Sequence, residues 1–199
     1  MGGNSRTIKT CRGDRKAPLS KNDLDYYSTP PEEIPVLLEA LRRNGITLGD
    51  RILEPACGDG SISKTLERLG YKVFSYDLVD RGYGVPGRDY LSRTKPFKGD
   101  ILTNPPFSCS LDFMKKSLEL IEDGSLAIFL VKLNYLSGKE RNKLYKSNPP
   151  KLILVYSYRI GCGKGGDFSK VVKGMDYCWM VFQKGYTGPT TLDWIGGKK

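Results

Sequence analysis

The amino-acid sequence predicts an α/β fold with a doubly wound, mostly parallel sheet. Strand-like apolar runs alternate with segments of helical periodicity along most of the 199 residues, which is the pattern of successive β–α units. Residues 126–131 are apolar throughout, as is typical of a central strand covered on both faces. A glycine-rich turn at residues 54–61 joins a strand to a helix, and ligands bind at such turns in doubly wound sheets.

The individual elements can be expected in order along the chain. After Pro31, apolar residues recur with helical spacing up to Leu41, which predicts a helix that ends at Gly45. Further helices are predicted over residues 62–69, 110–122 and 138–147, and strands over residues 51–54, 72–76, 100–103, 126–131, 152–156 and 177–183. Trp194 and Ile195 are expected to pack the C-terminal tail onto the core.

The sequence predicts two segments of different character. Residues 1–22 are polar and basic, so we expect a flexible N-terminal segment there. Residues 23–199 then form a single folded domain, which is a normal size for one α/β unit.

A double proline follows the predicted strand at residues 100–103. Prolines stop a strand ladder and fix the backbone, so nearby carbonyls stay free to accept other hydrogen bonds. Asn104 Oδ1 and the Pro105 carbonyl could accept the two N–H bonds of an exocyclic amino group, with Phe107 stacked on the attached ring. Asn104, Pro105, Pro106 and Phe107 are therefore the candidate catalytic residues, and adenine is the candidate target. A simple turn closed by a core phenylalanine is the competing interpretation.

The glycine-rich turn carries two carboxylates, Glu54 and Asp59. They would repel a pyrophosphate and attract a cationic amino group, which argues against a nicotinamide dinucleotide. An amino-acid-like cofactor such as S-adenosylmethionine fits better. Asp77 ends the next predicted strand, where it could accept hydrogen bonds from ribose hydroxyls.

Taken together, these motifs resemble the small, phage-type adenine-N6 DNA methyltransferases of the S-adenosylmethionine-dependent amino-methyltransferase family. The resemblance spans roughly residues 23–195, and its motifs in order are residues 25–31, 54–60, Asp77, 89–91, 104–107 and 176–190. It implies a Rossmann-like class I methyltransferase fold with strand order 3-2-1-4-5-7-6 and an antiparallel last strand. It also implies S-adenosyl-L-methionine as the cofactor and S-adenosyl-L-homocysteine as the product.

The resemblance assigns a cofactor site and a reaction. The cofactor-binding positions that carry over are Tyr27, Thr29, Pro30, Glu54, Pro55, Ala56, Gly58, Asp59, Gly60, Asp77, Asp89 and Tyr90. The implied reaction is direct methyl transfer to a flipped adenine held by residues 104–107. The sequence shows no separate target-recognition domain, so we expect short or relaxed sequence specificity.

The net charge of +10 and the pI of about 9.3 favour an anionic partner such as nucleic acid, and the resemblance implies DNA rather than RNA. A lysine-rich surface that merely aids solubility is the alternative, and the helix at 138–147 could equally be an ordinary charged face. Candidate nucleic-acid contacts come from two basic segments: Lys132, Asn134, Lys139, Arg141, Arg159, Lys164, Lys170 and Lys173.

Several functions remain open or are excluded by composition. No apolar run approaches the roughly 20 residues of a membrane span and no signal peptide is visible, so we expect a cytoplasmic protein of a bacterium or phage-infected cell. No metal site is expected, because the chain has no histidine and its cysteines are scattered. The alternatives to a DNA enzyme are an RNA adenine-N6 methyltransferase, a protein glutamine-N5 methyltransferase and a non-enzymatic nucleic-acid binder.

Overall fold

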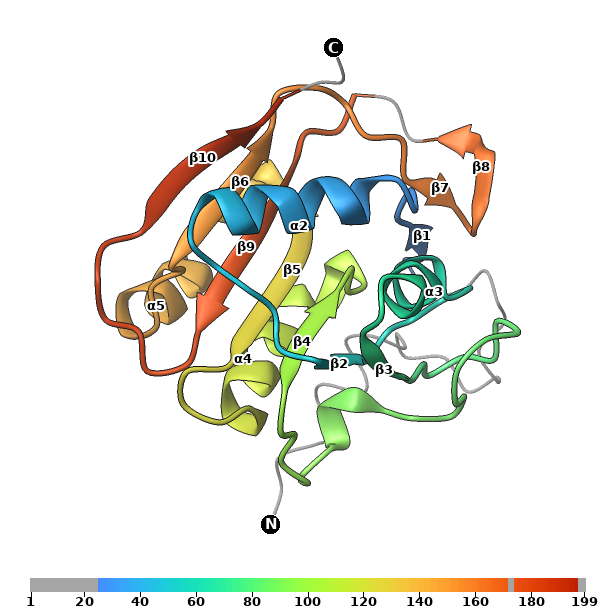
Figure 1. Cartoon of the computed structure of the whole chain (residues 1–199), viewed down its shortest axis with the longest axis horizontal. Helices are drawn as coiled ribbons and strands as arrows, with labels where there is room; N and C mark the ends of the chain where they lie inside the picture. The colour runs from blue at the N-terminus through green and yellow to red at the C-terminus, as the bar shows by residue number, and fades with distance from the viewer. Residues whose placement is uncertain (1–24, 172–173, 197–199) are drawn as a thin grey trace.

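A computed structural model describes residues 25–171 and 174–196, so the N-terminal segment 1–22 and Lys173 lie outside the described residues. Its centre is a seven-stranded sheet in the order β10-β6-β9-β5-β4-β2-β3 (Figure 1). Only β9 runs antiparallel to its neighbours, which confirms the doubly wound, mostly parallel sheet. The strands are β2 (Arg51–Glu54), β3 (Lys72–Ser75), β4 (Asp100–Thr103), β5 (Leu126–Lys132), β6 (Leu152–Tyr156), β9 (Tyr177–Gln183) and β10 (Thr191–Ile195).

Helices cover both faces of this sheet (Figure 1). Successive strand residues point to opposite faces, so Ile128 and Leu130 pack with α2 (Glu33–Arg43) and α3 (Ser61–Arg68). Phe129 and Val131 pack on the other side with α4 (Ser110–Leu120) and α5 (Lys139–Ser147). Because β5 is buried on both faces, its sequence is apolar almost without interruption.

The strand order differs from the expected one at both edges. After β3 the chain makes only an isolated bridge between Tyr76 and Val85, and no further strand joins that edge within the described residues. Gly82, Gly84 and Gly87 all have positive φ there, which interrupts an extended strand. At the opposite edge β10 adds a strand parallel to β6, where the sequence predicts only a C-terminal tail.

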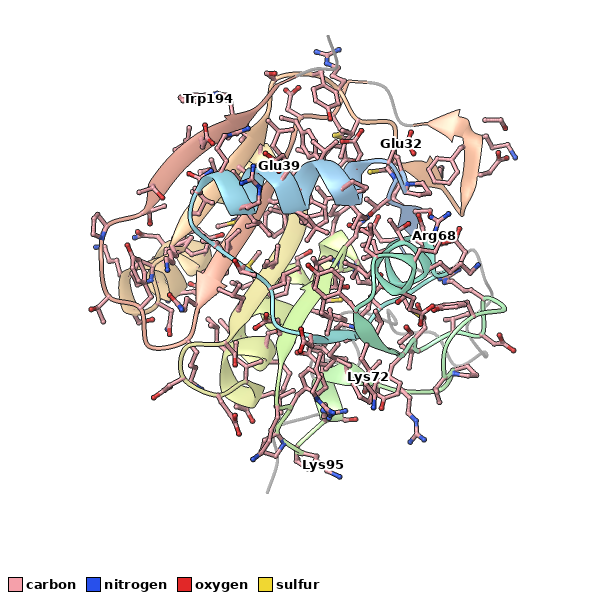
Figure 2. All side chains as sticks on the ribbon, in the orientation of Figure 1. Glu32, Glu39, Arg68, Lys72, Lys95 and Trp194 are labelled. Carbon is pink, nitrogen blue, oxygen red and sulfur yellow. The ribbon has the colours of Figure 1, made fainter. Side chains whose placement is uncertain are left out.

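The packing of that tail was predicted correctly for one residue and wrongly for another. Ile195 is buried at 2% exposure, but Trp194 is 58% exposed and points away from the body of the protein (Figure 2). The reason is strand alternation: β10 is an edge strand, and only alternate side chains face the core. The Trp194 main-chain N–H donates to Asp193, and its carbonyl accepts from Arg43 on α2.

A second, three-stranded antiparallel sheet joins segments far apart in sequence. Its order is β1 (Tyr27–Ser28), β7 (Gly163–Lys164) and β8 (Asp167–Val171). Residues 163–171, which are rich in glycine and lysine, are therefore largely a hairpin. Gly165 and Gly166 turn it with positive φ, and the Gly165 N–H donates to the Tyr26 carbonyl at 3.0 Å.

Three short 3₁₀ helices complete the described elements: η1 (Tyr90–Ser92), η2 (Phe107–Cys109) and η3 (Leu133–Leu136). Within residues 25–171 and 174–196, none of the helices combines the length and the apolarity that a bilayer span needs.

Candidate active site

A pocket opens where the carboxyl ends of β2, β3 and β4 meet, which is where ligands bind in open α/β sheets. Its empty space amounts to about 720 Å³, the open mouth included. The walls include residues from the turn after β2, the loop after β3, η1 and the segment after β4, namely Pro55, Ala56, Asp77, Leu78, Asp89, Tyr90, Asn104, Pro105, Pro106 and Phe113.

A smaller pocket of about 220 Å³ adjoins the first. Its walls carry the carboxyl-bearing part of the glycine turn, with Glu54 and Asp59, and the hydroxyls of Ser28 and Thr29. Four residues line both pockets: Tyr26, Tyr27, Ala56 and Asn104. The two spaces therefore meet beside Asn104, with a mostly apolar chamber on one side and an acidic one on the other.

Asn104 is held in one orientation by the segment around β1. Its Nδ2 donates to the Tyr27 carbonyl at 2.8 Å and to Thr29 Oγ1 at 3.1 Å. A carbonyl can only accept, so the nitrogen of the amide must face Tyr27 and the oxygen must face away. No donor of the described residues contacts Oδ1, which leaves it available at the junction of the two pockets.

The two prolines give this segment its second acceptor. The Pro106 carbonyl already accepts from the Cys109 N–H at 3.1 Å and from Ser110 Oγ at 3.0 Å. Pro105 is buried and lines the larger pocket, and in the described part of the chain no donor reaches its carbonyl. Asn104 and Pro105 thus offer two neighbouring acceptors.

Phe107 is placed differently from the open stacking surface that its sequence position suggested. It is 7% exposed and is not part of either pocket wall. The rings of Tyr27 and Tyr177 lie against it, with centroid distances of 5.4 and 6.1 Å. The Lys132 ammonium lies over the ring, 4.2 Å from its centroid.

Glu54 is a buried carboxyl at the bottom of the acidic pocket. It is 1% exposed and accepts a hydrogen bond from Ser63 Oγ, which in turn contacts Ser75 Oγ at 2.6 Å. Burial raises the pKa of Glu54 well above the usual carboxyl range, because the charged form loses its hydration. A cationic group in this pocket would restore the charged form.

Asp59 connects the glycine turn to β1. Its carboxylate accepts from Ser28 Oγ at 3.0 and 3.1 Å and from the Ser61 N–H at 3.1 Å, while its own N–H donates to the Tyr26 hydroxyl. These bonds hold the two walls of the acidic pocket together.

The glycines of the turn are required by the protein's own aromatic rings. A Cβ on Gly58 would lie 2.5 Å from the Tyr26 ring, and one on Gly60 would lie 2.3 Å from Tyr83. Both also have positive φ, +58° and +82°. The rings of Tyr26 and Tyr83 thus approach these two glycines closely, and neither glycine lines either of the two pockets described above.

Asp77 lies at 7% exposure beneath the larger pocket. Its Oδ2 accepts from the Gly58 N–H and its Oδ1 from the Val79 N–H, each at 2.8 Å. Burial raises its pKa despite these bonds. The residue therefore braces the glycine turn in addition to facing the pocket.

The remaining predicted cofactor positions are partly brought together. Asp89 caps η1 by accepting from the Leu91 N–H at 3.0 Å, and the Tyr90 hydroxyl contacts Ser117 Oγ at 2.7 Å, so both face the larger pocket from a fixed position. Pro30 is buried but lines neither pocket, because its carbonyl begins α2 by accepting from Glu33.

The sequence matches no protein-family model and no curated protein, but solved structures share its fold. A protein from Listeria monocytogenes named as a class I S-adenosylmethionine-dependent methyltransferase gives a TM-score of 0.57 at 13% identity, covering 95% of this chain and 70% of that chain. A protein from Pyrococcus horikoshii named as an RNA methyltransferase gives 0.60 at 17% identity, covering 85% and 91%. The methyltransferase subunit of a type I restriction-modification system from Streptococcus thermophilus gives 0.61 at 12% identity, covering 82% and 46%. The chain has a class I methyltransferase fold.

Within this methyltransferase fold, some predicted nucleic-acid contacts lie beside the candidate acceptors. Lys132 ends β5 over Phe107, and Arg141 lies 4.4 Å over the Tyr135 ring, whose hydroxyl donates to the Phe107 carbonyl. Lys164 pairs with Tyr27 in the small sheet. Asn134 and Lys139 are exposed on η3 and α5.

Two other predicted contacts are already paired with carboxylates. Arg159 lies 3.7 Å from Asp176, and Lys170 lies 3.0 Å from Asp167. Exposed ion pairs of this kind contribute little to stability.

Sequence reasoning missed several residues of the larger pocket, namely Asp25, Tyr26, Leu78, Arg81, Arg88 and Phe113. Most of them belong to loops or to a helix whose direction over the pocket depends on tertiary packing. Tyr26 had a usable signal, because it directly precedes Tyr27 in the first motif. The Arg81 guanidinium lies over the Tyr26 ring, 4.0 Å from the ring centroid.

Proposed function

We propose that this protein transfers the methyl group of S-adenosylmethionine to the N6 amino group of adenine in DNA. The observation that carries the proposal is the fixed orientation of Asn104. With Nδ2 held by Tyr27 and Thr29, Oδ1 is an acceptor facing a pocket, and the Pro105 carbonyl is a second one. Two acceptors side by side suit an NH₂ group attached to a planar ring.

The two adjoining pockets fit the two ends of the cofactor. The larger one combines apolar walls, such as Leu78 and Phe113, with the carboxyls of Asp77 and Asp89, which suits a nucleoside. The smaller one holds the buried Glu54, which suits an ammonium group. The junction lies at Asn104, so the reactive centre of a ligand that spans both pockets would lie near the acceptors.

The residues would act mainly by orientation. S-adenosylmethionine supplies an electrophilic methyl group on a sulfonium. The N6 lone pair of adenine is delocalised into the ring and is a poor nucleophile. Hydrogen bonds to Asn104 Oδ1 and the Pro105 carbonyl favour a pyramidal amine with its lone pair directed away from them. After transfer the amine releases a proton to water, so no histidine base is needed, and the chain has none.

Nucleic acid is the substrate class that the net charge and the lysine beside Phe107 favour. A duplex would have to release the target base from its stack before the base could reach Asn104. DNA is proposed over RNA because the order of the sequence motifs resembles that of the DNA adenine methyltransferases. A short or relaxed recognition site remains part of this proposal.

RNA adenine is the second candidate. The Pyrococcus horikoshii structure named as an RNA methyltransferase is matched over 91% of its length, and basic residues suit either polymer. A glutamine side chain also presents an NH₂ group and could use the same acceptors.

Transfer of a labelled methyl group to DNA, RNA and a glutamine-containing protein, measured side by side, tests the function. We expect label in DNA, at N6 of adenine after enzymatic digestion to nucleosides. Asn104→Ala should still bind the cofactor, and its rate of methyl transfer should fall by about 10²–10³-fold. Label mainly in RNA or protein would contradict the DNA assignment, and label with unaltered rate in Asn104→Ala would contradict the site.

A further inference from the structure

The ring of Phe107, on which a flipped base would stack in the proposed reaction, is covered by other side chains. Lys132 Nζ lies 4.2 Å from the ring centroid, and the ring is 7% exposed. Tyr27 and Tyr177 lie against other parts of the same ring, at tilts of 32° and 35°. The lysine is the polar, flexible member of this cover, because its ammonium lies at the end of a long aliphatic stem, whereas the two tyrosines are rigid rings.

The backbone of Lys132 is fixed while its ammonium is weakly held. The residue ends β5 and pairs with Tyr177 of β9, and its side chain is half-buried. Within residues 25–171 and 174–196, its ammonium has no carboxylate within ion-pair distance and no hydrogen-bond acceptor, only the face of Phe107. An aromatic face replaces part of the hydration of an ammonium but satisfies none of its three N–H donors geometrically.

A stacked base and this ammonium cannot occupy the same place. Stacked aromatic rings have centroids about 4.5 Å or more apart in offset arrangements, so a base on Phe107 would fill the space that the ammonium now holds. Lysine has a long flexible stem and acts as a point charge towards phosphate. A flipped nucleotide brings a phosphate together with the base that displaces the ammonium.

We propose that Lys132 is a specificity-determining residue that exchanges the face of Phe107 for a phosphate of the target nucleotide. The inference rests on the proposed function and deepens it. The ammonium covers the ring until a base arrives, and the phosphate linked to that base then takes the charge. A free nucleoside or a glutamine side chain brings no such phosphate and would leave the displaced charge without a partner.

Lys132→Met tests this exchange, because methionine keeps the apolar stem and removes the charge. Lys132→Arg should restore much of the function. Lys151→Met is the control: its ammonium also lies over a ring, 5.7 Å from the Tyr186 centroid, and donates to Gln183 Oε1, but it precedes β6 at the end of the strands opposite to that of Lys132. Thermal unfolding of all variants checks that each is folded.

The substrates are pools of DNA oligonucleotides that contain one adenine in random context. In one pool the linkages beside the adenine are phosphodiesters, and in the other they are neutral methylphosphonates. We expect Lys132→Met to raise the KM for the first pool severalfold with a smaller change in kcat. The slope of log affinity against log salt should fall by about 0.7, the value for one phosphate contact on a single strand.

The neutral linkage should weaken the unaltered protein by a similar factor and have little added effect on Lys132→Met, because both changes remove one contact. Additive losses, or a Lys132→Met variant with unaltered KM and salt slope, would overturn the inference while leaving the proposed function intact. Absence of methyl transfer by the unaltered protein to either pool would overturn the proposed function, and this inference with it.

Discussion

Asn104 donates from its side-chain amide to the main-chain carbonyl of Tyr27, 77 residues earlier in the chain, at 2.8 Å. The bond joins the end of β4 to the small sheet of β1, β7 and β8. Because the hairpin of β7 and β8 pairs with β1, the orientation of the candidate catalytic amide depends on residues from three distant parts of the sequence.

Replacing Asn104 with alanine should separate binding from chemistry. We expect the cofactor dissociation constant to change little, because the carboxyls of both pockets remain. Methyl transfer should fall by about 10²–10³-fold, the usual cost of one preorganised polar partner. Calorimetry with S-adenosylmethionine and a radiolabel assay check the two expectations.

Thr29→Val provides a graded comparison at the same amide. It removes the 3.1 Å acceptor of Asn104 Nδ2 and leaves the bond to Tyr27. We expect up to about a tenfold loss of kcat, in line with one neutral hydrogen bond. A loss as large as that of Asn104→Ala would mean that Thr29 has another role.

Asp77→Asn should weaken cofactor binding and loosen the glycine turn. An amide has one acceptor oxygen, so it can keep only one of the bonds to the Gly58 and Val79 N–H groups. We expect a dissociation constant raised about tenfold or more, with a lower Tm. Asp80→Asn is the control, because among the described residues this exposed carboxyl accepts only from the Gly82 N–H in the same loop. Equal effects of both variants would contradict a role at the pocket.

Glu54→Gln should change the pH dependence of stability. The folded-state pKa of Glu54 is raised above its unfolded value, so the stability of the protonated form is present below about pH 4.3 and lost as pH rises through the folded value. The amide avoids this loss, so the Tm of the ligand-free variant should exceed that of the unaltered protein at pH 8 and equal it at pH 4. Each kcal/mol of stability gained should raise the Tm by about 2–4 °C.

S-adenosylmethionine should raise the Tm of Glu54→Gln by less than it raises the Tm of the unaltered protein, because a neutral amide pairs poorly with an ammonium. Glu67→Gln is the control, since this exposed carboxyl accepts from Tyr83 outside the acidic pocket. A pH-independent Tm difference for Glu54→Gln would contradict a buried neutral carboxyl. Differential scanning fluorimetry with and without S-adenosylmethionine measures both effects.

Gly58→Ala should lower the free energy of unfolding by more than its positive φ alone would explain. The added Cβ would lie 2.5 Å from the Tyr26 ring, whereas Gly45→Ala, at φ +70°, meets nothing within 4 Å. We expect about 1 kcal/mol for Gly45→Ala from conformation alone. Gly58→Ala should exceed that and also weaken cofactor binding, because Tyr26 lines both pockets. Urea denaturation compares them, and equal losses would show that the ring simply moves aside.

Local patterns predicted the central elements well. The six sequence-predicted strands and four helices all form, with small differences at their ends. They could be predicted because burial on one or both faces leaves a periodicity in the sequence. β10 and the β7–β8 hairpin were missed, since each is stabilised by pairing with a distant strand, β6 and β1.

The site was predicted at the level of motifs and not of contacts. Asn104, Pro105, Asp77 and Glu54 do gather at the two pockets. The sequence could not reveal that Asn104 is oriented by the Tyr27 carbonyl, because a main-chain acceptor has no residue signature. Nor could it reveal that Lys132 covers Phe107, since that contact depends on how β5 ends beside β4.

The outer edge of β10 affects how readily the molecule associates with other chains in solution. The main-chain N–H and carbonyl of Trp194 at this outer edge could otherwise pair with a strand of another chain. They are occupied by hydrogen bonds with the side chains of Asp193 and Arg43. Hydrogen bonds from Arg43 and Asn44 hold the pKa of Asp193 down to about 2, so this cover stays charged at any ordinary pH. At this position the edge strand can thus display a large indole while its main chain is closed to pairing with another strand.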